Sequence, residues 1–243
     1  APRVVPPAGR VVVAKVRPAR AAPRVDHDML DSIDFEALQG IGLGDAVRRQ
    51  LLLGVADHQA QPMRLIEVQR EHFLLHDGRV TRRARCANAL RRDLQSQGED
   101  LAVGDWVLAR PGDAAGCTIT CRLLPGRRIT RRTLDGRANE HHGVAQRQVL
   151  VSNVDTALLV MGLDHDFHLR RLERYLALVQ MADVQPVLVL SKADSVAPEQ
   201  VALRIAEAGT VLPARTPVVA LDVRQPSAAA ALGEGRRRAH PVR

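Results

Sequence analysis

Residues 187–194 read Val-Leu-Val-Leu-Ser-Lys-Ala-Asp, and this stretch indicates the fold of the C-terminal half of the chain. Its four apolar residues form an uninterrupted run, as in a strand buried on both faces of a parallel sheet, and a polar turn follows. A second run of this kind lies upstream at Thr156–Met161, and leucines recur at helical spacing over Leu169–Val179. Strand, helix and strand in this order predict a βαβ unit.

Further elements extend this pattern in both directions. An apolar run at Val149–Val151 precedes the unit, a helical pattern follows at Glu199–Glu207, and another strand is expected at Pro217–Leu221. Together they are typical of the beginning of a doubly wound α/β domain. Ligands of that class bind at the carboxyl ends of the strands, which is where Ser191–Asp194 would lie.

Residues 62–126 follow a different sequence pattern, in which short strand-like runs are separated by turn-forming residues such as Asp77-Gly78 and Pro111-Gly112-Asp113. Five strands in about 60 residues predict a small barrel, and an OB-fold fits this number. An SH3-like barrel has similar spacing and stays open. The expected strands are Arg64–Gln69, His72–His76, Arg82–Cys86, Ala102–Arg110 and Cys117–Leu124.

The segment before the barrel divides into two parts. Residues 1–28 consist largely of Pro, Ala, Val and Arg without a helix or strand period, which predicts a disordered extension. Met29 is the first methionine, and we expect the native protein to begin there. Residues 29–61 predict a helical lead-in, because acidic capping residues precede apolar residues at helical spacing.

The net charge of +8 comes from 35 basic and 27 acidic residues. It lies at the two ends, since residues 1–28 and residues 224–243 each carry an excess of four positive charges and the part between them is neutral. The net charge therefore does not by itself indicate a nucleic-acid partner for the folded part.

Two arginine clusters nevertheless favour contact with RNA. Arginines at this density bind phosphate groups bidentately and release counterions from a nucleic-acid backbone. Aromatic residues make up only 2% of the chain, so we expect recognition of phosphate and shape rather than base stacking. A solvated arginine-rich surface is the alternative. The clusters are Arg79, Arg82, Arg83, Arg85, Arg91 and Arg92 in the barrel, and Arg127, Arg128, Arg131, Arg132, Arg137 and Arg147 in a loop-like basic linker over 127–147.

The three cysteines, Cys86, Cys117 and Cys121, predict reduced thiols rather than a disulfide framework or a metal site. Cys117 and Cys121 are four apart on an expected strand, so they share a face but lie about 13 Å apart, and we interpret both as core residues. The chain shows neither a membrane-spanning apolar run nor the apolar block of a signal peptide, and we expect a cytoplasmic monomer that does not bind membranes.

Ser191-Lys192-Ala193-Asp194 resembles the guanine-specificity motif of GTP-binding proteins, NKxD or TKxD. In that motif the carboxylate accepts hydrogen bonds from guanine N1–H and from the exocyclic amine, an arrangement that adenine cannot satisfy. Asp194 would thus select the base, and the stem of Lys192 would lie across the base plane. A solvated cap between strand and helix is the alternative interpretation.

Further residues resemble the ribosome small-subunit-dependent GTPase A family over about residues 29–232. The resemblance is carried by Gln148–Thr156, by Asp164–Phe167 with Leu169–Leu176, by Ser191–Asp194, and by Val103–Val107 in the barrel. It implies an OB-fold, then a circularly permuted GTPase domain, present here as residues 148–235. It also implies a zinc-binding domain and a role in late maturation of the small ribosomal subunit, whose presence stimulates GTP hydrolysis.

The resemblance implies GTP or GDP with Mg²⁺ as ligands, Zn²⁺ in a further domain, and the small ribosomal subunit with its rRNA as partner. Ser191, Lys192 and Asp194 would contact guanine, with Ser191 in place of the usual Asn or Thr. The backbone around Ala220 and Leu221 would lie near the base oxygen, although the family's Ser-Ala pair is missing there.

A phosphate-binding loop needs the pattern GxxxxGK[ST], and neither lysine of the chain, Lys15 or Lys192, stands in such a context. We therefore expect no catalytic residue and no GTP hydrolysis in this chain, and interpret it as truncated before the loop, with residues 236–243 as a non-native tail. Apolar surface should then be exposed on the strands at Thr156–Met161 and Val187–Leu190. The alternative function is a non-catalytic OB-fold module that binds ribosomal RNA.

Overall fold

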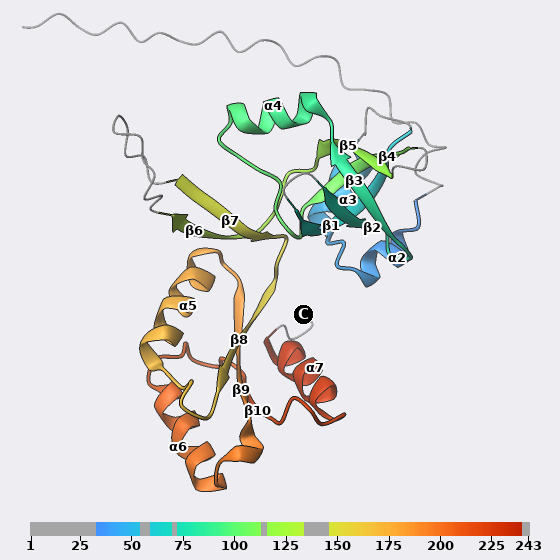
Figure 1. Cartoon of the computed structure of the whole chain (residues 1–243). Helices are drawn as coiled ribbons and strands as arrows, with labels where there is room; N and C mark the ends of the chain where they lie inside the picture. The colour runs from blue at the N-terminus through green and yellow to red at the C-terminus, as the bar shows by residue number, and fades with distance from the viewer. Residues whose placement is uncertain (1–32, 54–58, 70–71, 113–115, 134–145, 240–243) are drawn as a thin grey trace, which may run out of the picture.

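The computed structural model describes residues 33–53, 59–69, 72–112, 116–133 and 146–239. Within them, a small barrel with flanking helices precedes a three-stranded α/β unit, and a two-stranded sheet lies between the two parts (Figure 1). The expected extension at 1–28 lies outside the described residues. None of the helices in the described part is both long and apolar enough to span a membrane.

The barrel is closed and follows the order β1-β2-β3-β5-β4. All neighbours are antiparallel except β3 and β5, which run parallel. This confirms the expected OB-like barrel, and the strand bounds differ from the expected ones by a few residues at most positions. The strands are β1 (Gln61–Val68), β2 (Phe73–His76), β3 (Thr81–Cys86), β4 (Trp106–Pro111) and β5 (Cys117–Arg122).

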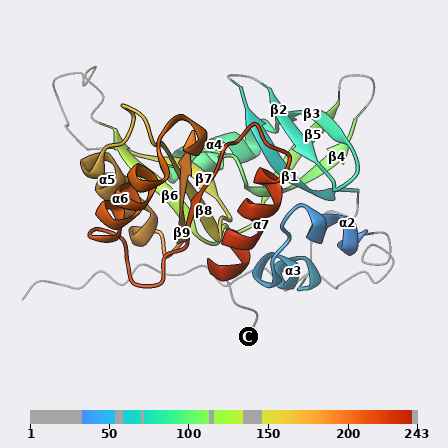
Figure 2. The ribbon, with the colours of Figure 1, turned by 90° about the horizontal axis from the view of Figure 1, so that it is seen from below.

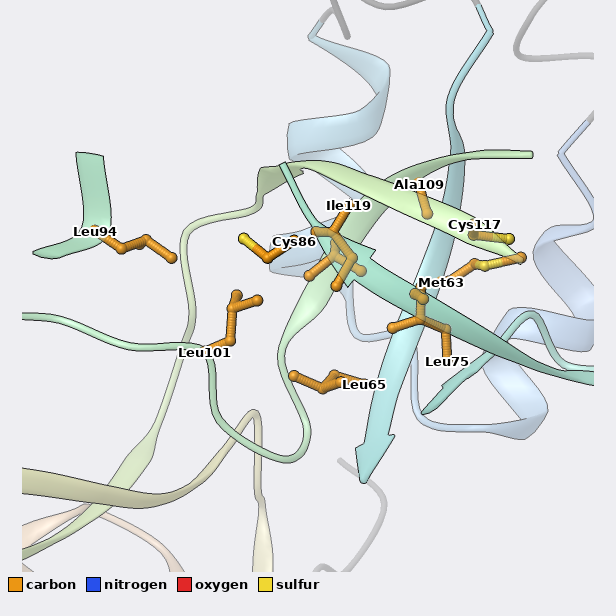
Figure 3. Packing of buried hydrophobic residues seen from close by; sticks show 11 residues of the cluster. Met63, Leu65, Leu75, Cys86, Leu94, Leu101, Ala109, Cys117 and Ile119 are labelled. Carbon is orange, nitrogen blue, oxygen red and sulfur yellow. The ribbon is translucent and has the colours of Figure 1, made fainter. Parts of the chain in front are cut away.

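The barrel interior is filled by apolar side chains from every strand (Figure 3). Leu65, Leu75 and Ile119 are fully buried there. Helix α4 (Asn88–Ser96) adds Leu94 to the same cluster. The sequence interpretation missed this helix, although Leu90 and Leu94 stand four residues apart, because the apolar side is narrow and the rest of the segment is polar.

Cys121 corrects one sequence interpretation. Cys117 is buried, as expected, but Cys121 is exposed. The register of β5 against β4 slips at one point, since Leu108 faces Cys121 whereas Ala109 faces Ile119. The extra residue in β5 is Thr120, and such a bulge turns the following side chains to the opposite face. The spacing rule for an unbroken strand therefore fails at Cys121.

Two helices precede the barrel, in the segment where a helical lead-in was expected. Helices α2 (Phe35–Gly40) and α3 (Asp45–Leu52) bury Leu38, Val47 and Leu51 against Trp106 of the barrel. Asp34 caps α2, because its carboxylate accepts a hydrogen bond from Ala37 N–H at 3.0 Å.

Strands β6 (Arg128–Thr133) and β7 (Gln146–Ser152) form an antiparallel pair. The segment 127–147 was expected to be loop-like, and this is wrong for its two ends, which belong to strands. Residues 134–145 lie outside the described part. The apolar run at Val149–Val151 lies in β7, which pairs with β6 and does not join the parallel sheet.

The α/β unit confirms the predicted βαβ order. Its parallel sheet has the order β10-β9-β8, with helices α5 and α6 on one face and α7 on the other (Figure 2). The elements are β8 (Thr156–Gly162), α5 (Leu169–Met181), β9 (Gln185–Ser191), the short 3-10 helix η1 (Ala193–Ser195), α6 (Pro198–Gly209), β10 (Val218–Ala220) and α7 (Ala228–Ala239). Residues 236–239, assigned to a non-native tail, therefore lie in α7.

The expectation of exposed apolar surface holds for β8 and is wrong for β9. Val187–Leu190 is buried on both faces because β9 is the central strand and helices cover each side. Strand β8 pairs with β9 and with no other described strand. Its Leu158 and Val160 are paired in register with Val187 and Val189, which α7 covers, yet they remain 45% and 57% exposed.

A short joint at Asn153 connects the barrel to the α/β unit. The Asn153 side chain donates a hydrogen bond to the Gly104 carbonyl at 2.9 Å and accepts one from Gly126 N–H at 2.9 Å. Asn153 has a φ of 54°, a conformation that asparagine tolerates better than most residues. Arg64 of the barrel donates to the Asn153 carbonyl at 3.1 Å. The joint is therefore specified by several directed contacts.

Candidate functional site

The loops that follow the three parallel strands meet at one edge of the sheet. Asp164–Asp166 follows β8, Lys192–Asp194 follows β9, and Leu221–Arg224 follows β10. Backbone hydrogen bonds connect these loops, because Leu163 N–H donates to the Ser191 carbonyl at 3.0 Å and Ala193 N–H donates to the Leu221 carbonyl at 3.3 Å. The sequence motif thus lies where ligands of this fold class bind.

Ser191 anchors the end of β9 to the end of β8. Its side chain is buried, and its hydroxyl lies 3.3 Å from the Met161 carbonyl, to which it donates. This contact uses the hydroxyl inside the protein. Ser191 therefore supports the turn, whereas Lys192 and Asp194 present their side chains to the surface.

Lys192 adopts a left-handed backbone conformation, with φ 60° and ψ 37°. A residue with a Cβ atom rarely adopts it, because the conformation costs on the order of 1 kcal/mol or more. Here it is held by Ser195, whose backbone N–H donates to the Lys192 carbonyl at 3.1 Å and whose hydroxyl donates to it at 2.7 Å. Strain of this kind often occurs at functional turns, and it fixes the direction in which the lysine side chain leaves the loop.

The Lys192 ammonium group contacts Asp164, which follows β8. The Nζ atom donates to Asp164 Oδ2 at 2.6 Å. Lys192 thereby lowers the pKa of the Asp164 carboxyl, and Asp164 raises the pKa of Lys192. Gly162 makes room for this arrangement, since a Cβ atom there would lie 2.5 Å from Asp164 Oδ1.

Asp194 lies in η1 with its carboxylate partly exposed, and Arg224 contacts it. Arg224 Nη2 donates to Asp194 Oδ2 at 2.5 Å. The same guanidinium binds Asp222, with Nε 2.9 Å from Oδ1 and Nη2 3.1 Å from Oδ2. Hydrogen bonding to Arg224 lowers the pKa of Asp222, and Asp222 followed by Asp194 raises that of Arg224.

Ala220 and Leu221 lie beside the motif, as their sequence positions suggested. Leu221 is buried, and its N–H donates to the Leu190 carbonyl at 2.9 Å. Its carbonyl accepts from Ala193 N–H. Both polar backbone groups of Leu221 thus hold the two loops together.

Sequence reasoning placed the backbone near Ala220 to Asp222 beside the base oxygen, but it assigned no side-chain role in base contact to Asp164, Asp222 or Arg224. A usable signal was present, because each follows a strand of a predicted parallel sheet and the carboxyl ends of such strands meet. The particular ion pairs depend on side-chain directions in the loops, which spacing does not specify.

The arginine clusters do not form one surface of free cations. Arg79 binds Asp34 at 2.5 Å, and Arg82 lies 3.7 Å from Asp77. Arg83 and Arg85 are exposed neighbours on the outer face of β3.

In the second cluster, acidic and polar groups engage most described members. Arg127 contacts Asp155 at 3.1 Å and Asp183 at 3.0 Å, and Arg128 contacts Glu99 at 3.3 Å. Arg131 donates to Gln148 at 3.4 Å. Arg137 and the side chains of Arg132 and Arg147 lie outside the described part.

The described residues contain no group of three or more His, Cys, Asp or Glu side chains able to hold a metal ion. Burial raises the pKa values of the Cys86 and Cys117 thiols, which disfavours the thiolate form that binds metals.

A family model and similar curated relatives point to the same protein family. Residues 130–234 match the family model described as RsgA GTPase. The small ribosomal subunit biogenesis GTPase RsgA of Xanthomonas axonopodis pv. citri (strain 306) is 37% identical over 214 residues, covering 84% of this chain and 55% of the relative. Its counterpart in Xanthomonas campestris pv. campestris (strain B100) is 38% identical over 153 residues, covering 63% of this chain and 39% of the relative. The chain thus spans about half the length of the curated relatives it matches.

Two solved structures share the fold. One is YloQ, described as a circularly permuted GTPase, with a TM-score of 0.51 and 16% identity over 74% of this chain and 58% of that one. The other is YjeQ from Thermotoga maritima, with a TM-score of 0.53 and 14% identity over 76% of this chain and 66% of that one. At these identities the likeness concerns the fold alone.

Proposed function

The chain belongs to the RsgA GTPase family, and from this premise we propose that it carries the guanine-binding part of a GTP-binding factor for late maturation of the small ribosomal subunit. The similarity to the small ribosomal subunit biogenesis GTPases of two Xanthomonas species supports this role. The small ribosomal subunit is then its partner, the cytoplasm its location, and GTP or GDP its ligand, bound by a monomer.

One observation carries the proposal: Lys192 and Asp194 follow the central strand β9 in a turn whose conformation is strained and held by specific hydrogen bonds. Asp194 accepts from guanine N1–H and the exocyclic amine through its two carboxylate oxygens. Lys192 covers one face of the base with its methylene stem while its ammonium group stays on Asp164. Adenine presents no pair of adjacent donors on this edge, so the carboxylate discriminates against it.

Hydrolysis needs groups that the 243 residues do not supply. The sequence contains no GxxxxGK[ST] pattern to cradle phosphates and bind Mg²⁺. We propose that the chain as given binds the base without hydrolysing GTP, and that ribosome-stimulated hydrolysis belongs to full-length members of the family. The described residues contain no group of side chains that fits a zinc ion.

A titration with GDP and ADP tests the proposal. The full chain should bind GDP more tightly than ADP, and Asp194→Asn should remove that preference. Glu199→Gln serves as control, because Glu199 is an exposed carboxylate in the first turn of α6 and its removal changes the charge equally. Equal affinity for GDP and ADP in the unmodified chain would contradict the proposal.

A second candidate function, an RNA-binding barrel without nucleotide binding, is favoured by Arg83 and Arg85. These exposed arginines are separated by one residue on β3 and point away from the barrel core. Exchange of both for Ala should weaken binding to 16S rRNA fragments and reduce its salt dependence, because fewer counterions are released. RNA binding with no guanine nucleotide binding would favour this candidate over the first.

A further inference from the structure

Arg224 donates a hydrogen bond to the carboxylate of Asp194, the group that would bind the base. Its Nη2 atom has two hydrogens, and the two acceptors within reach are Asp222 Oδ2 at 3.1 Å and Asp194 Oδ2 at 2.5 Å. The Nε atom completes a two-point contact with Asp222. Arg224 is thus anchored on Asp222 and extends from there to Asp194.

The groups offered to Asp194 by Arg224 and by guanine are chemically alike. A guanidinium and the N1–C2–N2 edge of guanine both present planar N–H donors to a carboxylate. Guanine needs both oxygens of Asp194, one for N1–H and one for the exocyclic amine. Because Arg224 already donates to Oδ2, the two donors compete for this atom.

We propose that Arg224 is an internal competitor for the base site, a residue that guanine must displace from Asp194. The inference rests on the proposed function, because it takes Asp194 as the carboxylate that selects guanine. It makes Arg224 a determinant of affinity and of discrimination, since a ligand must replace the guanidinium with a matching pair of donors.

The ion pair on the other side of the site has a different effect. Lys192 contributes its methylene stem, and Asp164 binds only the terminal Nζ atom. The base can therefore lie on the stem while the pair with Asp164 persists. The Lys192–Asp164 pair therefore leaves the base site open, whereas the Arg224–Asp194 pair occupies Asp194 Oδ2, an atom that the base requires.

Displacement of Arg224 is feasible because the side chain is 72% exposed and stays bonded to Asp222 when it leaves Asp194. An exposed ion pair contributes little, so its removal should tighten base binding about two- to fivefold. Salt should act in the same direction, since it screens the pair.

The test is calorimetric titration of the full chain with guanosine, which is uncharged and so reports on the base site without phosphate contacts. Arg224→Ala should bind guanosine about two- to fivefold more tightly than the unmodified chain. In the unmodified chain the affinity should rise when NaCl is raised from about 0.05 to about 0.5 M, and Arg224→Ala should lack this response. Arg170→Ala removes an exposed arginine from α5 and serves as the charge-matched control.

Arg224→Lys provides a second test, so the result does not depend on whether Arg224→Ala folds. Its single ammonium group cannot keep the two-point contact with Asp222, so its affinity should lie between those of the unmodified chain and Arg224→Ala. Weaker or unchanged guanosine binding in Arg224→Ala would overturn the inference and show that Arg224 supports Asp194 instead. Failure of all these proteins to bind guanosine would contradict the proposed function itself. Binding that Asp194→Asn abolishes but Arg224→Ala leaves unchanged would overturn the inference alone.

Discussion

The ammonium group of Lys192 lies 2.6 Å from the carboxylate of Asp164, and this pair joins the loop after β9 to the loop after β8. Lys192 has a left-handed backbone, and Gly162 leaves the space that Asp164 occupies. Three local features thus orient one lysine stem along the surface where a base would lie.

Asp164→Asn should weaken guanosine binding about two- to fivefold, because the neutral amide holds the Lys192 ammonium group less firmly and the stem loses its fixed direction. The pKa of Lys192 should fall toward its ordinary value, which NMR of the labelled lysine side chain can follow. Glu199→Gln again controls for the lost charge. An unchanged Lys192 pKa together with unchanged affinity would show that the pair has no influence on the site.

Gly104→Ala should destabilise the fold by about 2–4 kcal/mol. Gly104 has a φ of 89°, and a Cβ atom there would lie 2.0 Å from the Ser152 carbonyl oxygen, a backbone atom that cannot yield without moving the joint at Asn153. Chemical denaturation measures the change. Gly209→Ala, at the end of α6 with no atom within 4 Å of the added Cβ, should be neutral or slightly stabilising.

Asp105→Asn should become more stabilising as the pH rises. Burial raises the pKa of the Asp105 carboxyl, so the folded state holds this proton more tightly than the unfolded state does. The resulting stability is complete below the ordinary Asp pKa of about 3.9 and is lost as the pH rises through the folded-state value.

The pH dependence of the difference in unfolding free energy between Asp105→Asn and the unmodified chain reports on the Asp105 carboxyl alone. Carboxyls with lowered pKa values, such as Asp34 and Glu99, lose their contribution as the pH falls, but they do so equally in both proteins. A difference that stays flat from about pH 3.5 to about pH 7 would contradict the assignment to Asp105.

Val160→Lys should reduce aggregation with little effect on stability. Val160 is exposed on the edge strand β8, and a lysine on such a strand opposes pairing with another chain. Val223→Lys is a matched control, since Val223 is also 57% exposed but lies outside the strands. Light scattering at equal concentration should show less association for the first variant than for the second, and equal association in both would exclude β8 as the cause.

The sequence predicted the fold well where one local pattern dominates. The run Val187–Leu190 identified a buried parallel strand because nothing but apolar residues can occupy a strand covered on both faces. Prediction failed where a single residue changes the pattern: the bulge at Thr120 exposes Cys121, and the sparse apolar positions of α4 hid a helix.

Part of the candidate site was also predictable, and part was not. The placement of Lys192 and Asp194 was predictable, because a polar motif that directly follows a buried parallel strand lies at the carboxyl end of the sheet. Arg224 was not, because its contact with Asp194 spans thirty residues and depends on how the loops after β9 and β10 fold toward each other.

Titration of the chain with guanosine, inosine and xanthosine decides whether Asp194 binds the N1–H and exocyclic amine of a guanine base. Inosine lacks the exocyclic amine, and xanthosine replaces it with a carbonyl oxygen. The unmodified chain should bind guanosine about tenfold more tightly than inosine. Asp194→Asn should instead bind xanthosine more tightly than guanosine, because the introduced amide can donate a hydrogen bond to the additional carbonyl oxygen of xanthosine. Equal affinity for all three nucleosides in both proteins would contradict a role for Asp194 in base recognition.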